Sequence, residues 1–116
     1  MFSKFVASLV LAVTSLTVAA SAETVKCSYY AHKYDGRRTA SGQRFSSNQL
    51  TAAHKTLPLG TRVKLTNPSN HRSVIVRVND RGPFIKGRDI SVTHRAAKRL
   101  GFTRAGVADL DMETLK

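Results

Sequence analysis

The chain has 116 residues and a formal net charge of +12, because 19 Lys and Arg outnumber 7 Asp and Glu. This length allows at most one small domain, and the charge predicts attraction to a polyanion: nucleic acid, an anionic lipid surface or an acidic cell-wall polymer. The basic residues are dispersed and the chain has only five Phe, three Tyr and no Trp, so we expect no nucleic-acid partner.

The first 22 residues predict a secretory signal peptide. Lys4 gives a short positive start, residues 5–20 carry no charge, and Ala20-Ser21-Ala22 forms a small-residue cleavage site. Ser and Thr residues interrupt the apolar run, which disfavours a stable membrane span, with an uncleaved anchor as the alternative. We therefore expect an exported protein, periplasmic or secreted, whose domain is 23–116. Cleavage would leave 94 of the 116 residues and, with one lysine lost, a net charge of +11.

The remaining chain predicts a mainly β domain with one short helix. The helix is expected between Thr93 as its N-cap and Gly101 as its C-terminal stop. Apolar alternation and turn residues predict six short strands, at 24–31, 50–54, 61–66, 74–78, 89–92 and 107–112. This combination favours a small closed β-barrel.

The single cysteine, Cys27, excludes a disulfide within the chain. It lies in the first expected strand. Two alternatives stay open, a small buried thiol and a disulfide between two chains in an oxidising compartment.

The strand at 74–78 leads directly into a candidate site. Val74, Val76 and Val78 alternate with Ile75 and Arg77, and the turn sequence N-D-R-G-P follows. A stiff β-branched strand can fix the carboxylate of Asp80 at its end, although the carboxylate could instead only stabilise the turn.

His54 ends another apolar segment, so it could face the same mouth as Asp80. No two His stand at metal-ligand spacing on a recognisable element, and no nucleophile-elbow sequence is present. We therefore predict neither a metal site, nor a cofactor, nor a Ser-His-Asp site.

Four blocks, in order along the chain, resemble the RlpA family. They are Tyr29-Tyr30, Arg38–Gly42, Leu50–Pro58 and Val76–Phe84, and Gly87-Arg88 and the Ala96-Ala97 helix agree with them. The resemblance implies a double-psi β-barrel, the fold of expansins and barwin-like proteins. It also implies a lytic transglycosylase that acts on peptidoglycan glycan strands lacking stem peptides. Implied partners are these strands and the cell-wall or division machinery.

Carried over position by position, the resemblance implies Asp80 as the catalytic acid/base and His54 as its orienting partner. Gln43 stands where the family carries Glu, and Ser91 stands where an Asp is usual. An amide cannot act as the acid, but it can hold a sugar hydroxyl. We therefore expect substrate contacts from Gln43, Arg38, Thr39, Asn79 and Arg81, with Arg37 also bordering the groove.

The chemistry leaves three functions open. A lytic transglycosylase can work with one acid/base carboxyl, whereas a two-carboxylate hydrolase needs a pair across the bond. The retained Asp80 and His54 favour an endolytic transglycosylase that forms 1,6-anhydro-muramic ends. Gln43 and Ser91 favour a non-catalytic, expansin-like module that binds cell-wall polysaccharide. A secreted ligand-binding or effector protein unrelated to the wall is the third.

Overall fold

The computed structural model describes residues 22–115, so the expected signal peptide lies outside the described residues except for Ala22. The described part of the chain contains six strands, one α-helix and one short 3-10 helix. Their bounds are β1 Glu23–Tyr29, η1 His32–Tyr34, β2 Thr51–His54, β3 Arg62–Asn67, β4 Arg72–Asp80, β5 Ile90–Val92, α1 His94–Leu100 and β6 Val107–Thr114. Within residues 22–115 no helix is long and apolar enough to cross a membrane.

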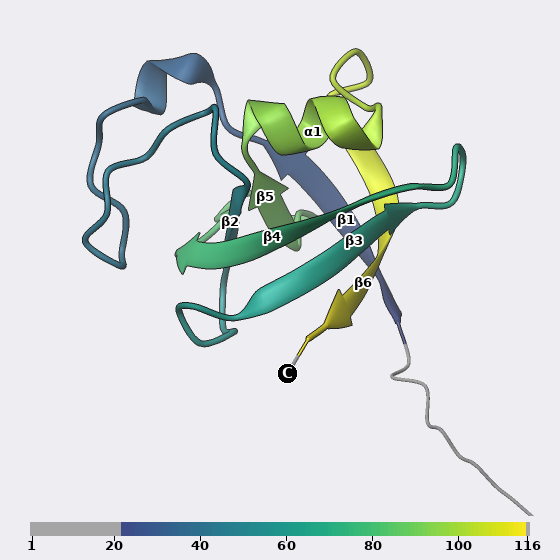
Figure 1. Ribbon diagram of the computed structural model, residues 1–116, viewed down its shortest axis with the longest axis horizontal. Coiled ribbons are helices and arrows are strands. Elements are labelled where there is room, and N and C mark those ends of the chain that lie inside the picture. Colours follow the sequence, from purple (N-terminus) through teal and green to yellow (C-terminus); the bar gives the residue numbers. More distant parts are fainter. Residues whose placement is uncertain (1–21, 116) are drawn as a thin grey trace, which may run out of the picture.

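The six strands close into a barrel in the order β1-β5-β2-β4-β3-β6 (Figure 1). The pairs β1–β5 and β2–β4 are parallel, while the other neighbours are antiparallel. Parallel neighbouring strands need long crossover connections, and the irregular segments of the chain lie in these connections. The expected six-stranded closed barrel with one short helix is therefore confirmed.

Strand β4 lies between β2 and β3, and its side chains alternate as the sequence predicts. Val74, Val76 and Val78 are buried, whereas Ile75 and Arg77 are exposed. Val74 pairs with Leu65 and Val76 with Val63 of the neighbouring strand β3. The strand continues to Asp80, two residues beyond its expected end, because backbone pairing with β2 extends through the polar Asn-Asp pair. Asp80 is thus the last residue of a strand.

Helix α1 covers one end of the barrel (Figure 1). The Thr93 hydroxyl accepts a hydrogen bond from the Ala96 amide, and Gly101 ends the helix at a φ of 81°. The Asn70 side-chain amide donates to the Leu100 carbonyl at 3.0 Å. A Cβ at position 101 would lie 2.6 Å from that same amide nitrogen. Glycine is therefore required for both the backbone conformation and the close approach, and both expected helix ends are confirmed.

Cys27 is fully buried in β1, opposite Ile90 of β5. Burial raises the pKa of its thiol far above the ordinary value. This position agrees with the buried-thiol alternative, since a disulfide to a second chain would require β1 to open.

Candidate active site

A cavity of about 520 Å³ opens where β4 ends. This volume suits a small ligand or a short piece of a polymer. Its wall comes from the end of β1 and the segment after it, from the turn after β4, and from Ser91 of β5. The lining residues are Ser28, Tyr29, Tyr30, Ala31, Tyr34, Arg37, Arg38, Thr39, Phe45, Asp80, Arg81, Gly82, Pro83, Phe84, Ile85 and Ser91.

Asp80 enters the cavity through an irregularity in the pairing of β2 with β4. Ala52 pairs with Val78 and Ala53 with Asp80, so Asn79 is skipped. Such bulges re-aim side chains at strand ends. The Asp80 Oδ1 accepts hydrogen bonds from the backbone amides of Ala40 at 3.0 Å and Arg81 at 2.8 Å. The carboxylate therefore both stabilises the turn and faces the cavity.

Tyr30 lines the same cavity as Asp80. Its ring packs edge-on against Phe45 at 5.0 Å and Tyr34 at 5.8 Å between ring centroids. Burial, and then the negative charge of Asp80, raise the pKa of Tyr30 well above its ordinary value. The phenol thus remains a proton donor toward the carboxylate. This role is not evident from the sequence alone, although Tyr30 belongs to one of the family-like blocks.

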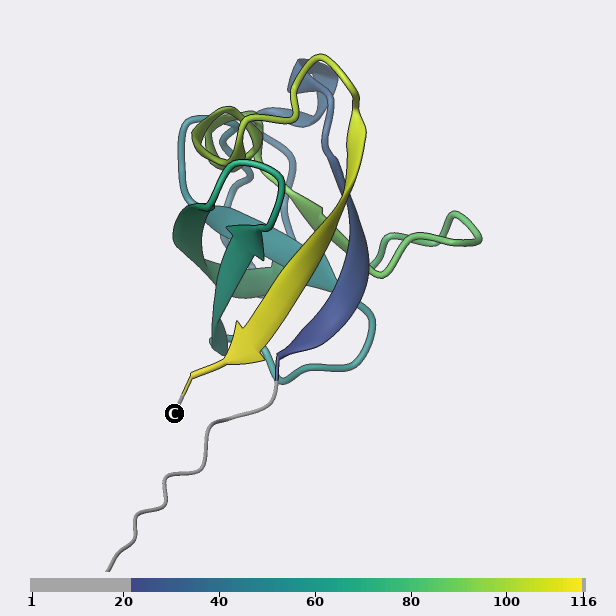
Figure 2. The same cartoon turned by 90° about the vertical axis from the view of Figure 1, so that its right-hand side faces the viewer.

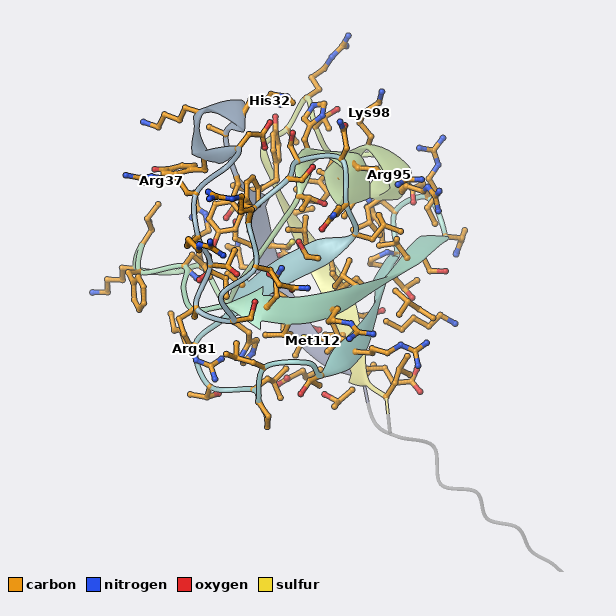
Figure 3. The ribbon with its side chains drawn as sticks, turned by 60° about the vertical axis from the view of Figure 1, so that its left-hand side comes forward. His32, Arg37, Arg81, Arg95, Lys98 and Met112 are labelled. Atoms are coloured by element: carbon orange, nitrogen blue, oxygen red, sulfur yellow. The ribbon has the colours of Figure 1, made fainter. Side chains whose placement is uncertain are left out.

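Three arginines make the cavity mouth basic. Arg37, Arg38 and Arg81 all line it, as expected, and Figure 3 places Arg37 and Arg81 on the same side of the barrel. The Arg81 Nη1 donates to the carbonyl oxygens of Leu57 at 2.6 Å and His54 at 3.1 Å. Among the described lining residues Asp80 is the only carboxylate, so the cavity pairs one acid with three guanidinium groups.

The segment 35–47, which contributes several lining residues, forms an ordered wall of the cavity. Asp35 accepts hydrogen bonds from the amide and hydroxyl of Ser47 at 2.8 and 2.9 Å. The Phe45 amide donates to the Arg37 carbonyl at 2.7 Å, and the Thr39 amide donates to the Gln43 carbonyl at 2.8 Å. Thr39 is buried and lines the cavity. The Asp35 carboxylate therefore stabilises this wall through its hydrogen bonds to Ser47.

Gln43 and Asn79 lie beside the cavity, not among its lining residues. The Asn79 Nδ2 donates to the Gln43 Oε1 at 3.4 Å, and the Ser41 hydroxyl donates to the same oxygen at 3.3 Å. Asn79 is buried, whereas Gln43 is exposed. Sugar contacts from these two residues stay predictions.

His54 does not line the cavity that holds Asp80. It lines a separate hollow of about 370 Å³. Ala53 pairs with Asp80, and successive side chains of a strand point to opposite faces, so the next residue is directed away. The His54 Nδ1 accepts hydrogen bonds from the amides of Thr56 and Leu57, both at 3.1 Å. Burial is the main cause that lowers the pKa of His54. The structure thus separates the two residues that the sequence analysis placed in one groove.

Within residues 22–115 no three His, Cys, Asp or Glu side chains come together in a way that could hold a metal ion. Residues 22–112 match the family model described as lytic transglycolase. The chain belongs to this RlpA-like family. The match covers every element that builds the cavity.

Curated relatives carry the family's name. A protein of Synechocystis sp. named probable endolytic peptidoglycan transglycosylase RlpA is 46% identical, over 90% of this chain and 33% of its own length. The endolytic peptidoglycan transglycosylase RlpA of Pasteurella multocida is 51% identical, over 77% of this chain and 30% of its own length. The chain therefore spans about a third of the length of these relatives.

Solved structures show the fold. The Streptomyces papain inhibitor superposes with a TM-score of 0.66 at 22% identity, covering 82% of this chain and 94% of its own. An expansin of Clavibacter michiganensis superposes with a TM-score of 0.65 at 17% identity, covering 82% of this chain and 50% of its own. The RlpA-like domain is thus a double-psi β-barrel, as expected.

Proposed function

We propose that this RlpA-like domain cleaves peptidoglycan glycan strands by lytic transglycosylation, with Asp80 as acid and then base. The observation that carries the proposal is that Asp80 is the only carboxylate among the described residues lining the cavity. The names of the relatives support the same reaction class.

The reaction needs one group that gives and regains a proton. Protonated Asp80 donates its proton to the glycosidic oxygen, and the bond from that oxygen to C1 of the muramic residue breaks with its electron pair left on the oxygen. The 6-hydroxyl of the same residue then attacks C1, and its proton passes to the Asp80 carboxylate. No water is consumed, so one carboxyl suffices. Hydrolysis would use a second carboxylate about 5–9.5 Å away.

The neighbours of Asp80 orient it for this step. The amides of Ala40 and Arg81 hold Oδ1, and we assign the protonated Tyr30 phenol, whose pKa is raised by burial and by the Asp80 charge, as a third donor to the carboxylate. His54 enters the proposal as a supporting residue, because its Nδ1 organises the turn whose carbonyls hold the Arg81 guanidinium.

The basic mouth suits strands that have lost their stem peptides. Removal of a stem peptide leaves a free lactyl carboxylate on each muramic residue, and guanidinium groups bind carboxylates in a charge-assisted, bidentate manner. Arg37, Arg38 and Arg81 line the cavity, so we assign them to these carboxylates.

The proposed substrate lies outside the cytoplasm, so we also propose export. The charge and cleavage pattern of residues 1–22 support it. N-terminal sequencing of protein from the periplasm or medium should begin at Glu23, and an exported chain that retains Met1 would contradict cleavage.

A second candidate is a non-catalytic, expansin-like module that holds glycan without cutting it. It is favoured by Gln43, which replaces the family's Glu. Purified protein and its Asp80→Asn variant should be incubated with glycan strands freed of stem peptides. Transglycosylation predicts that the variant still binds but cleaves at least ~100-fold more slowly, as for loss of a general acid.

The asparagine Oδ1 can still accept from both amides, so the thermal midpoint should change little. A loss of several degrees would identify the carboxylate as structural, and binding without cleavage by the wild type would favour the non-catalytic module.

A further inference from the structure

The chain between β4 and β5 projects from the barrel as an apolar-tipped loop, visible as the light green loop at the right of Figure 2. Phe84 is 82% exposed and Ile85 is 64% exposed. They are the most exposed large hydrophobic residues of the part that the structure describes. Contiguous exposed apolar side chains rimmed by polar residues are typical of interaction sites and ligand-binding grooves.

The loop holds these side chains at the edge of the cavity. Phe84 and Ile85 line it together with Asp80, and the buried Gly82 and Pro83 continue the same wall. A Cβ built at Gly82 would lie 3.5 Å from both Cδ2 and Cε2 of Phe84. The phenyl ring therefore rests over the Gly82 backbone, a support that only a glycine with its φ of +124° provides.

We propose that Phe84 and Ile85 form a sugar-stacking platform that positions one pyranose ring of the glycan strand beside Asp80. This inference rests on the proposed function, in which the substrate is a glycan strand, and it assigns the residues that select that substrate.

The other aromatic residues and the polar groups of the cavity lining favour a sugar as the occupant. Tyr30, Tyr34 and Phe45 form an aromatic cluster that lines the same cavity. A pyranose ring has an apolar C–H face and a rim of hydroxyl groups, so it needs both aromatic faces and hydrogen-bonding side chains. Preformed ligand sites combine an apolar lining with a few polar groups in this way. A lipid surface would need only the apolar tip.

A single tryptophan can report on this platform, because the chain has none. Phe84→Trp keeps a stacking ring, and Leu59→Trp serves as the matched control, since Leu59 is 40% exposed and lines neither hollow. Both are made with Asp80→Asn to prevent cleavage. Titration with glycan strands freed of stem peptides should shift the emission of the first variant to the blue and leave that of the second unchanged.

Affinity gives the second measurement. In the Asp80→Asn chain, Phe84→Ala should weaken glycan binding roughly tenfold, as expected when a partly covered phenyl contact is lost. Leu59→Ala should leave binding unchanged, and Phe84→Trp should restore it.

Equal affinity of Phe84→Ala and its parent would overturn the platform even if the wild type cleaves glycan. A tenfold loss would support it even if the wild type does not cleave. If Phe84→Ala no longer sediments with anionic phospholipid vesicles as its parent does, while its glycan binding is unchanged, the loop contacts a membrane surface. That result would also overturn the platform.

Discussion

Removal of one oxygen atom from Tyr30 tests whether the phenol orients the catalytic carboxyl. Tyr30→Phe keeps the ring that packs at 5.0 Å against Phe45 and deletes the hydroxyl that we propose as a donor to Asp80. A hydrogen bond to a charged group contributes about 1.5–3 kcal/mol, which corresponds to roughly a 10- to 100-fold loss in kcat. We expect that loss with glycan affinity unchanged.

The assay is the rate of anhydro-muramic product formation at saturating glycan, together with KM and the thermal midpoint. Tyr29→Phe is the matched control, because the Tyr29 hydroxyl donates to the Thr103 carbonyl at 2.9 Å; it should lower stability by about 1 kcal/mol and leave kcat unchanged. Because the pKa of Tyr30 is raised, the phenolate absorbance of the wild type should show a late step above about pH 10 that Tyr30→Phe lacks. Wild-type kcat in Tyr30→Phe, or a loss confined to KM, would refute the orienting role.

Three further predictions follow from other buried or hydrogen-bonded groups. Because the pKa of His54 is lowered in the folded state, the unfolded chain binds more protons, and the free energy of unfolding should fall as pH drops below about 6.5. His54→Asn can still accept hydrogen bonds from the turn amides, so its melting temperature should depend less on acid pH. An acid dependence equal to that of the wild type would contradict this. Cys27 should react with a thiol reagent only after unfolding, because it is fully buried and its pKa is raised; fast labelling of native protein would contradict its burial. Gln43→Glu should change the cleavage rate by less than about threefold, because Gln43 contacts Asn79 outside the cavity and a general acid must reach its substrate. A gain of 100-fold or more would contradict this and identify position 43 as the site of a second acid.

The barrel could be predicted because its signals are local. Val74, Val76 and Val78 alternate with a period of two, and this period alone decides which face of β4 is buried. Thr93 and Gly101 define the helix, since capping chemistry depends on residues within one turn. Strand ends were less certain. β4 extends to Asp80 because β2 pairs with it, and that partner is distant in sequence.

The candidate site could be predicted only in part, for the same reason. The turn sequence pointed to Asp80, and the family-like blocks pointed to the arginines. The position of His54 depends on a register shift between β2 and β4, which no local pattern reveals. The role of Tyr30 depends on two segments about 50 residues apart in the chain, and only the folded barrel brings its phenol to Asp80.

In the proposed reaction one carboxyl drives an intramolecular transfer without water. The most direct test is mass spectrometry of the products formed from stem-peptide-free glycan strands in water enriched in oxygen-18. Transglycosylation predicts 1,6-anhydro-muramic ends, one water lighter than reducing ends and free of oxygen-18, with none formed by Asp80→Asn. New reducing muramic ends formed in place of anhydro ends, or intact strands after prolonged incubation with protein that binds them, would contradict it.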